Sequence, residues 1–395
     1  MKRLFIAIQY MELGGVERSL LGLLGALDPA RFELDLFVYR HSGELMPLIP
    51  KHVRLLPELP AYRALSRPLG AILREGHLCL FAARMVAKWR AARFGKTLSG
   101  VENYAIFDAV DAATCPFLPS LKHWGTYDLA ISFLTPHRIV RDKVSARRKI
   151  AWIHTDYSSI GIDTASELPV WRSYDHIAAI SPEAARGFAA RFPELEEKLV
   201  LIENVLSPQS VRDQAALEDV AALMSGSPCL CTVGRFSHAK GIDRIPKIAA
   251  GLVRRGLTDL RWHLVGYGDE ASVRRAIAAE GMERHVIVVG KRANPYPFMR
   301  ACDLYVQPSR YEGKAVAVRE AQILGRPVAI TRYPTAMSQL EDGVDGLIVP
   351  NDEEGAADAL FRLLQNPEYL AQLAAACRSR DYGNREAAAV LESLI

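Results

Sequence analysis

Two glutamates and a glycine in residues 309–327 have the types and spacing to hold a phosphorylated, hydroxyl-bearing ligand. Glu312 and Gly313 follow an expected strand, and Glu320 lies eight positions later in a segment with helical apolar spacing. Carboxylates so spaced on a helix are separated by roughly 12 Å at about 1.5 Å per residue. That is wider than the roughly 5 to 9.5 Å between the acid and base of a glycoside hydrolase. The first turn of a helix offers free N–H groups and a positive dipole end. The spacing favours a nucleotide sugar, and the alternative is an ordinary amphipathic helix.

Two cations lie in a turn after the expected strand 229–235. Arg235 and Lys240 both precede an expected helix start near residue 242. The cations and the helix amides could therefore converge on a diphosphate. A departing nucleoside diphosphate needs such charge, because negative charge develops on it as the glycosidic bond breaks. The alternative is a pair of solvated surface cations.

The spacing of Glu312 and Glu320 resembles the Glu-x7-Glu signature of retaining GT-B glycosyltransferases of family four, and Arg235 and Lys240 match that family's arginine and lysine. The resemblance implies an α/β fold with two Rossmann-like domains facing each other across a cleft. It also implies that Glu312 contacts donor-sugar hydroxyls, that Glu320 holds the ribose, and that the two cations bind the donor diphosphate.

The resemblance extends to a histidine and to several backbone positions. His154 matches a histidine placed near the donor sugar, with a structural histidine as the alternative, and Asn204 matches an asparagine near the hinge. Independently of the resemblance, Asp156 is expected to orient His154. Catalytic roles are expected for His154, Arg235, Lys240 and Glu312. The expected donor-binding positions besides Arg235, Lys240, Glu312 and Glu320 are Gly14, Gly15, Gly234, Gly268, Gly313, Lys314, Ala315 and Val316. Lys314 and Ala315 replace the family's usual phenylalanine and glycine. For the Gly14–Gly15 pair and for Gly268, a tight turn is the alternative.

Strand-like apolar runs alternate with helical patterns in both halves of the 395-residue chain. This alternation predicts two parallel sheets, with ligands beyond the carboxyl ends of the strands. The expected domains are 1–206 on the acceptor side and 228–380 on the nucleotide-sugar side. A linker is expected at 207–227, and a C-terminal helix in 381–395 is expected to pack back on the first domain.

Positive charge is concentrated in one insert of the first domain, near residues 61–100. The chain as a whole carries +4, whereas residues 61–96 contain eight Lys or Arg and one Glu, a net of +7. Leu78, Phe81, Met85 and Trp89 recur there at helical spacing, so a basic amphipathic helix is expected. Such a helix can lie on an anionic membrane. The alternative is a helix packed on its own domain with a solvated face. No nucleic-acid motif accompanies the charge.

The remaining composition is that of a folded, reducing-compartment protein. The six cysteines show no metal-like spacing, and we expect them to be small buried side chains. No Asp-x-Asp pair is placed to hold a metal, so no cofactor or metal is expected. The short N-terminal apolar run is interpreted as a strand and not a signal peptide, and a cytoplasmic location, peripheral to the membrane, is expected.

Together with the resemblance, these patterns predict a metal-independent hexosyltransferase, and the resemblance implies that the transfer is retaining. The donor is a nucleotide sugar, with UDP favoured, and the acceptor is a glycan or a lipid-linked glycan of surface-polysaccharide or lipopolysaccharide biosynthesis. A nucleotide-sugar epimerase and a non-catalytic nucleotide-sugar-binding protein are the alternatives. A nicotinamide oxidoreductase is disfavoured because no G-x-G-x-x-G follows the first strand.

Overall fold

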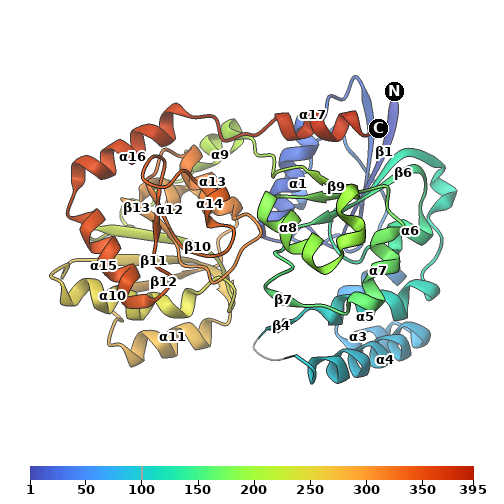
Figure 1. The fold of residues 1–395 in the computed structure, drawn as a ribbon, viewed down its shortest axis with the longest axis horizontal. Coiled ribbons are helices and arrows are strands. Elements are labelled where there is room, and N and C mark those ends of the chain that lie inside the picture. Colours follow the sequence, from blue (N-terminus) through green and yellow to red (C-terminus); the bar gives the residue numbers. More distant parts are fainter. Residues whose placement is uncertain (99–100) are drawn as a thin grey trace. The chain divides into compact units, whose positions relative to one another are not determined.

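The computed structural model describes residues 1–98 and 101–395, so residues 99 and 100 of the expected basic insert lie outside the description. The chain forms two compact units (Figure 1). The first contains Met1–Val205 and Arg385–Ile395, and the second contains Leu206–Asn384. In the described part of the chain, no helix combines the length and apolarity needed to span a bilayer.

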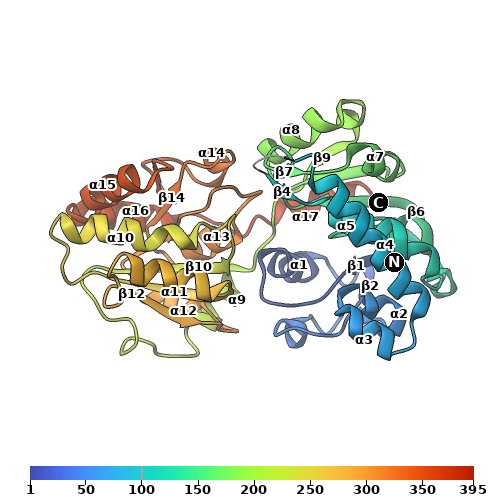
Figure 2. The same ribbon diagram turned by 90° about the horizontal axis from the view of Figure 1, so that it is seen from below.

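The first unit is built on a seven-stranded sheet of order β3-β2-β1-β5-β6-β8-β9. All its pairs are parallel. The strands are β1 (Lys2–Ile8), β2 (Phe32–Val38), β3 (Arg54–Leu55), β5 (Thr126–Ser132), β6 (Ser145–Ile153), β8 (His176–Ala179) and β9 (Leu199–Leu201). A separate parallel pair joins β4 (Glu102–Asn103) and β7 (Ile160–Gly161). Helices cover both faces of the sheet, which explains why strands such as β1 are apolar on both sides (Figure 2).

The helices of the first unit are α1 (Gly15–Ala26), α2 (Pro60–Arg63), α3 (Leu69–Arg74), α4 (Leu78–Gly95), α5 (Ala105–Thr114), α6 (Arg138–Lys143), α7 (Thr164–Arg172), α8 (Pro182–Arg191) and α17 (Glu386–Ser393). Ser181 caps α8 by accepting a hydrogen bond from the N–H of Ala184 at 3.1 Å, and Pro182 occupies the first helical position. A serine followed by proline is a typical start of a helix.

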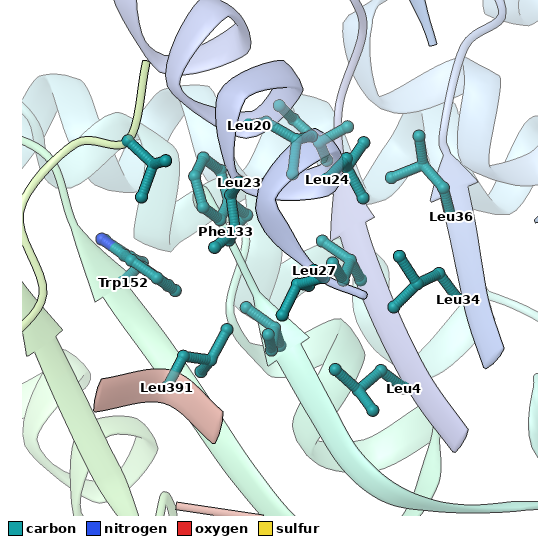
Figure 3. Close-up of a cluster of buried hydrophobic side chains, with 14 of the residues drawn as sticks. Leu4, Leu20, Leu23, Leu24, Leu27, Leu34, Leu36, Phe133, Trp152 and Leu391 are labelled. Carbon is teal, nitrogen blue, oxygen red and sulfur yellow. The ribbon is translucent and has the colours of Figure 1, made fainter. Parts of the chain in front are cut away.

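Leucines of α1 form the centre of the first core. They pack with Leu4 of β1, Leu34 of β2 and Trp152 of β6 (Figure 3). Leu391 of α17 joins the same cluster, as do Ala387 and Ala388. The last eleven residues therefore complete a core that the first half of the chain begins.

The second unit contains a six-stranded parallel sheet of order β12-β11-β10-β13-β14-β15. The strands are β10 (Cys229–Phe236), β11 (Arg261–Gly268), β12 (Val286–Gly290), β13 (Leu304–Gln307), β14 (Val328–Thr331) and β15 (Leu347–Val349). The helices are α9 (Pro208–Ala215), α10 (Ile245–Arg254), α11 (Glu270–Ala279), α12 (Tyr296–Ala301), α13 (Val316–Ile323), α14 (Ala336–Gln339), α15 (Glu353–Leu364) and α16 (Pro367–Ser379). The expected α/β class with two Rossmann-like units is confirmed.

Residues 207–227 differ from the expected linker, because they lie within the second unit. Helix α9 packs against α12 and α13, and Val211 and Ala215 are part of a buried cluster of that unit. The Pro, Gly and Ser residues of this stretch mark turns around a packed helix.

The cysteines follow the expectation with one exception. Five are buried thiols, whereas Cys79 is exposed on α4.

Candidate donor site

A glycine holds the loop of Lys240 against the end of β13. Gly241 has φ +63°, and a Cβ built there would lie 2.1 Å from the carbonyl oxygen of Pro308. Only glycine fits such a close approach at this backbone angle. The loop therefore places the Lys240 ammonium within hydrogen-bond distance of Glu312, with Nζ 2.6 Å from Oε1 and 2.7 Å from Oε2.

Glu312 is buried and is held by a chain of polar side chains from β13 and the loop after it. Ser309 Oγ donates to Glu312 Oε1 at 2.6 Å, and Gln307 Nε2 lies 3.3 Å from the same oxygen. Tyr305 donates in turn to Gln307 Oε1 at 2.7 Å. These neutral residues were not anticipated from the sequence. Their position at the carboxyl end of a buried strand is the signal that could have identified them.

Glu320, the second glutamate of the motif, lies on α13 and is only 2% exposed. Its Oε1 accepts a hydrogen bond of 2.7 Å from the hydroxyl of Tyr296. Burial raises the pKa of Tyr305 well above its ordinary value, and the charges of Glu320 and Glu312 raise it further. Both glutamates of the motif are therefore buried and hydrogen-bonded to neighbouring hydroxyl groups.

The loop between Glu312 and α13 has its own internal partners. The N–H of Ala315 donates to Gln339 Oε1 at 2.6 Å, so the structure gives this expected phosphate-binding amide a side-chain acceptor. The reason is that α14 places the fully buried Gln339 beside the start of α13. Gln339 Nε2 is buried and is without a hydrogen-bond partner among the described residues. Lys314 and Val316 are also buried, and the N–H of Val318 in the first turn of α13 donates to the carbonyl oxygen of Ala315 at 3.2 Å.

Arg235 is exposed near the end of β10, beside Gly234 and in register with Tyr267 of β11. The Lys291 ammonium lies 4.6 Å from the centre of the Tyr267 ring. A Cβ on Gly268 would lie 2.4 Å from the carbonyl oxygen of Phe236. Close packing of β10 and β11 thus explains Gly268 without a ligand, and its contact with a nucleotide stays a prediction. Tyr267 and Lys291 are further candidate donor-binding residues, which the sequence motifs did not indicate.

His154 lies in the first unit, immediately after β6. Its ring stacks with Trp152, with centroids 6.2 Å apart and planes 10° apart, and it lies 4.8 Å from Phe133. Burial lowers the pKa of His154 to about 3, and its Nε2 has no partner among the described residues. The imidazole is therefore neutral near pH 7 and can accept or donate one hydrogen bond there.

The expectation that Asp156 orients His154 is wrong. Asp156 Oδ1 accepts from the N–H of Ser158 at 2.9 Å, and Oδ2 accepts from the Ser159 hydroxyl at 2.9 Å. A carboxylate two residues ahead of a turn is satisfied by its own backbone. Asp156 therefore stabilises the loop after β6.

The remaining expected positions of the first unit lie around α1. Gly14 is the N-cap of this helix, and a Cβ there would lie 2.2 Å from Glu17 Oε2. The buried Glu17 carboxylate thus lies over the backbone of Gly14, next to the exposed Gly15. Asn204 accepts a hydrogen bond of 2.9 Å from Ser19 of the same helix, a contact that ties the segment after β9 to α1.

A small pocket of the first unit was not anticipated. It lies beyond the ends of β5 and β6 and is lined by Asp108, Asp111 and Glu167 together with aromatic side chains. Burial raises the pKa of Glu167 to about 7 and that of Asp111 to about 8. Glu167 nevertheless accepts a hydrogen bond of 3.0 Å from Trp171 Nε1.

We expect the carboxyl group of Glu167 to make stability depend on pH. A carboxyl whose pKa is raised on folding contributes stability below its unfolded pKa, here 4.5, and that contribution is lost as pH rises through about 7. The unfolding free energy of the native chain relative to Glu167→Gln should thus fall by about 3 kcal/mol between pH 4 and pH 8. Denaturant unfolding of both proteins across this range measures the difference. Glu194→Gln, at an exposed site, is the control, and a pH-independent difference for Glu167→Gln would contradict the assignment.

The two units, each built on a parallel sheet, form a GT-B fold. The contact between Lys240 and Glu312 lies in the second unit. Solved structures with this fold cover the whole chain. A variant of Staphylococcus aureus TarM, in complex with Fondaparinux, alpha-GlcNAc-glycerol and UDP, is 14% identical with a TM-score of 0.71, covering 100% of this chain and 99% of that one. Anabaena HepE in complex with UDP-glucose is 17% identical with a TM-score of 0.69, covering 100% of both chains. At these identities the likeness shows the fold alone.

Residues 227–366 match the model of glycosyl transferases group 1. The second unit therefore resembles this family over 140 of the 395 residues of the chain. Alpha-D-kanosaminyltransferase of Streptomyces kanamyceticus is 31% identical over 151 residues, which are 37% of this chain and 39% of that enzyme. The lipopolysaccharide core biosynthesis glycosyltransferase LpsE of Rhizobium meliloti is 28% identical over 218 residues, which are 54% of this chain and 60% of that enzyme. The chain thus spans about two to three fifths of the length of these relatives.

Proposed function

We propose that the chain transfers a hexosyl group from a nucleotide sugar, bound by the second unit, to a glycan or lipid-linked acceptor in polysaccharide or lipopolysaccharide biosynthesis. The observation that carries this proposal is the contact between Lys240 and Glu312, 2.6 Å apart, where Glu312 lies in the loop between β13 and α13, the helix that contains Glu320. A UDP donor is favoured because TarM and HepE, whose fold is similar, were solved with UDP or UDP-glucose. A cytoplasmic location is part of the proposal.

Each charged side chain has a role in this scheme. Lys240 and Arg235 neutralise the charge that develops on the departing nucleoside diphosphate. Glu312 accepts hydrogen bonds from donor-sugar hydroxyls, and Glu320 from the ribose. The Nε2–H of Gln339 is a buried donor that a ligand oxygen could satisfy. The neutral imidazole of His154, in the first unit, is proposed to contact the donor sugar.

The proposed transfer retains the anomeric configuration. The bond from the anomeric carbon to the diphosphate oxygen breaks while the acceptor oxygen forms a bond on the same face. The acceptor's proton passes to the departing phosphate oxygen, so no additional base is required.

Nucleoside diphosphate release tests the proposal. Purified protein is incubated with UDP- and GDP-sugars and with glycan and lipid-linked acceptors, and product configuration is assigned by NMR coupling constants. Acceptor-dependent release with a retained anomer is expected. Release with none of the donors and acceptors would refute the enzyme assignment, and an inverted product would refute retention. Epimerised donor without acceptor would instead indicate an epimerase, and tight binding without turnover a binding protein.

Turnover is expected to persist without divalent metal. Lys240 is held at the site by its contact with Glu312 and can supply the positive charge on the diphosphate. We therefore expect activity in excess EDTA to stay within about twofold of that with added Mg²⁺. Loss of activity in EDTA that is restored by one divalent ion would contradict the proposal.

A further inference from the structure

Helix α4 turns large apolar side chains outward and small ones inward. Leu78, Met85 and Trp89 are 63%, 47% and 62% exposed, and Val86 is also exposed. The buried face consists of Leu80, Ala83, Ala87 and Ala91. The apolar stripe that the sequence places on one side of this helix is therefore its solvent-facing side.

The inward face explains this orientation. The buried alanines, which recur every four residues, let α4 approach α5 closely, and α3 packs beside α4. The three helices lie together in the first unit in both ribbon views (Figures 1 and 2). The fold thus anchors α4 through Leu80 and the alanines, which leaves Leu78, Met85 and Trp89 as an exposed apolar stripe.

The stripe is flanked by cations that have no acidic partner. Lys88, Arg90, Arg93 and Lys96 are exposed, and none forms an ion pair among residues 1–98 and 101–395. Helix α4 contains no aspartate or glutamate. The Arg93 guanidinium lies 5.8 Å from the centre of the Trp89 ring. Apolar side chains in the middle and unpaired cations at the sides are complementary to a surface with negative headgroups over an apolar interior.

The fourth cation within the helix has a different role. Arg84 points inward and donates to the carbonyl oxygens of Ala64 and Arg67, and burial lowers its pKa. Arg63 and Arg67 are paired with Glu75. The cations available to a partner are therefore those beside the stripe.

We propose that α4 is a membrane-docking helix that lies in the plane of an anionic lipid bilayer, with Leu78, Met85 and Trp89 in the acyl boundary and the flanking cations among the headgroups. Its 18 residues span about 27 Å, which suits a helix lying along a surface. This proposal stands on α4 alone and does not rest on the proposed function.

Vesicle binding tests the docking helix. The full chain is sedimented with vesicles of phosphatidylcholine alone, or of equal parts phosphatidylcholine and phosphatidylglycerol. Binding only to the anionic vesicles is expected, with the partition coefficient falling about fivefold for each flanking cation changed to Gln. The double variant Met85→Glu/Trp89→Glu should lose binding by at least about tenfold. The matched control is Leu217→Glu/Leu223→Glu, two exposed apolar positions of the second unit, which should bind like the native chain.

Trp89 also reports its own depth. The other tryptophans are buried or half-buried, so acyl-chain brominated lipids should quench the fluorescence of Trp89 selectively. Trp89→Phe should still bind, with the quenching lost. The substituted side chains are exposed, so each variant is expected to keep the native fold. Circular dichroism of each variant checks this expectation.

Three results would overturn the proposal: equal binding of Met85→Glu/Trp89→Glu and the native chain, no binding to anionic vesicles, or a Trp89-dependent dimer without vesicle binding. Donor hydrolysis or transfer to a water-soluble acceptor is measured separately and should be unchanged in the Met85→Glu/Trp89→Glu variant. Failure of docking is thereby distinguished from failure of the proposed function.

Discussion

Lys240→Ala is expected to lower turnover by about 100- to 1,000-fold, the loss typical when one preorganised donor to a developing negative charge is removed. The KM for the donor should change much less, because the ammonium acts most strongly on the charge that appears as the diphosphate departs. Steady-state kinetics of nucleoside diphosphate release measure both constants.

The control for Lys240 is chosen from the same stretch of chain. Lys247 is an exposed lysine of α10 that lies 3.8 Å from Glu353, and Lys247→Ala should leave kcat and KM unchanged. Because Lys240→Ala leaves the buried Glu312 without its cation, thermal unfolding of the variant must also be compared. Native-like kcat in a folded Lys240→Ala protein would remove Lys240 from the mechanism.

Glu320→Ala is expected to weaken nucleotide binding by about 10- to 100-fold, the range for losing a hydrogen bond to a buried charged group. The carboxylate is 2% exposed, so water cannot replace it. Calorimetric titration with UDP and with the nucleotide sugar gives the dissociation constants, and kcat at saturating donor should fall less than affinity. Glu280→Ala, at an exposed glutamate after α11, is the control.

The hydroxyl of Tyr296 must be separated from the role of the carboxylate, because it donates to Glu320 in the absence of a ligand. Tyr296→Phe removes this contact and leaves Glu320 in place. It should change nucleotide affinity by no more than about threefold if the ribose replaces the tyrosine as donor. An effect of Tyr296→Phe as large as that of Glu320→Ala would indicate that Glu320 only positions the tyrosine.

Charged motif residues of the second unit could be predicted from the sequence because their spacing reflects the sheet. Lys240 and Glu312 are far apart in the chain, yet each follows a buried parallel strand, and the ends of neighbouring strands β10 and β13 lie at one edge. The contact of Lys240 with Glu312 agrees with that argument. Tyr296 and Gln307 could not be predicted in this way, because neutral polar residues have no distinctive spacing. Only the folded structure shows that Tyr296 contacts Glu320 and that Gln307 contacts Glu312.

The orientation of α4 could not be predicted, for a different physical reason. Periodicity shows which residues share a helical face, and α4 has two apolar faces, one of large side chains and one of alanines. Which of the two faces is buried depends on how closely α4 packs against α5. Close packing favours the face with the small alanine side chains. The segment 207–227 is also mispredicted from its pattern. Its Pro and Gly residues indicate turns, but Val211 and Ala215 pack in a buried cluster of the second unit, so the segment belongs to that unit.

The route of the chain through α17 has a consequence for biosynthesis on the ribosome. Ala387, Ala388 and Leu391 belong to the core around α1, so the unit translated first lacks part of its interior until residues 385–395 have been translated. The intervening segment, Leu206–Asn384, emerges earlier and has its own complete core. We therefore expect that the domain synthesised second is the first to reach its final fold, and that a stop codon before residue 385 leaves an aggregation-prone N-terminal half beside an intact C-terminal one.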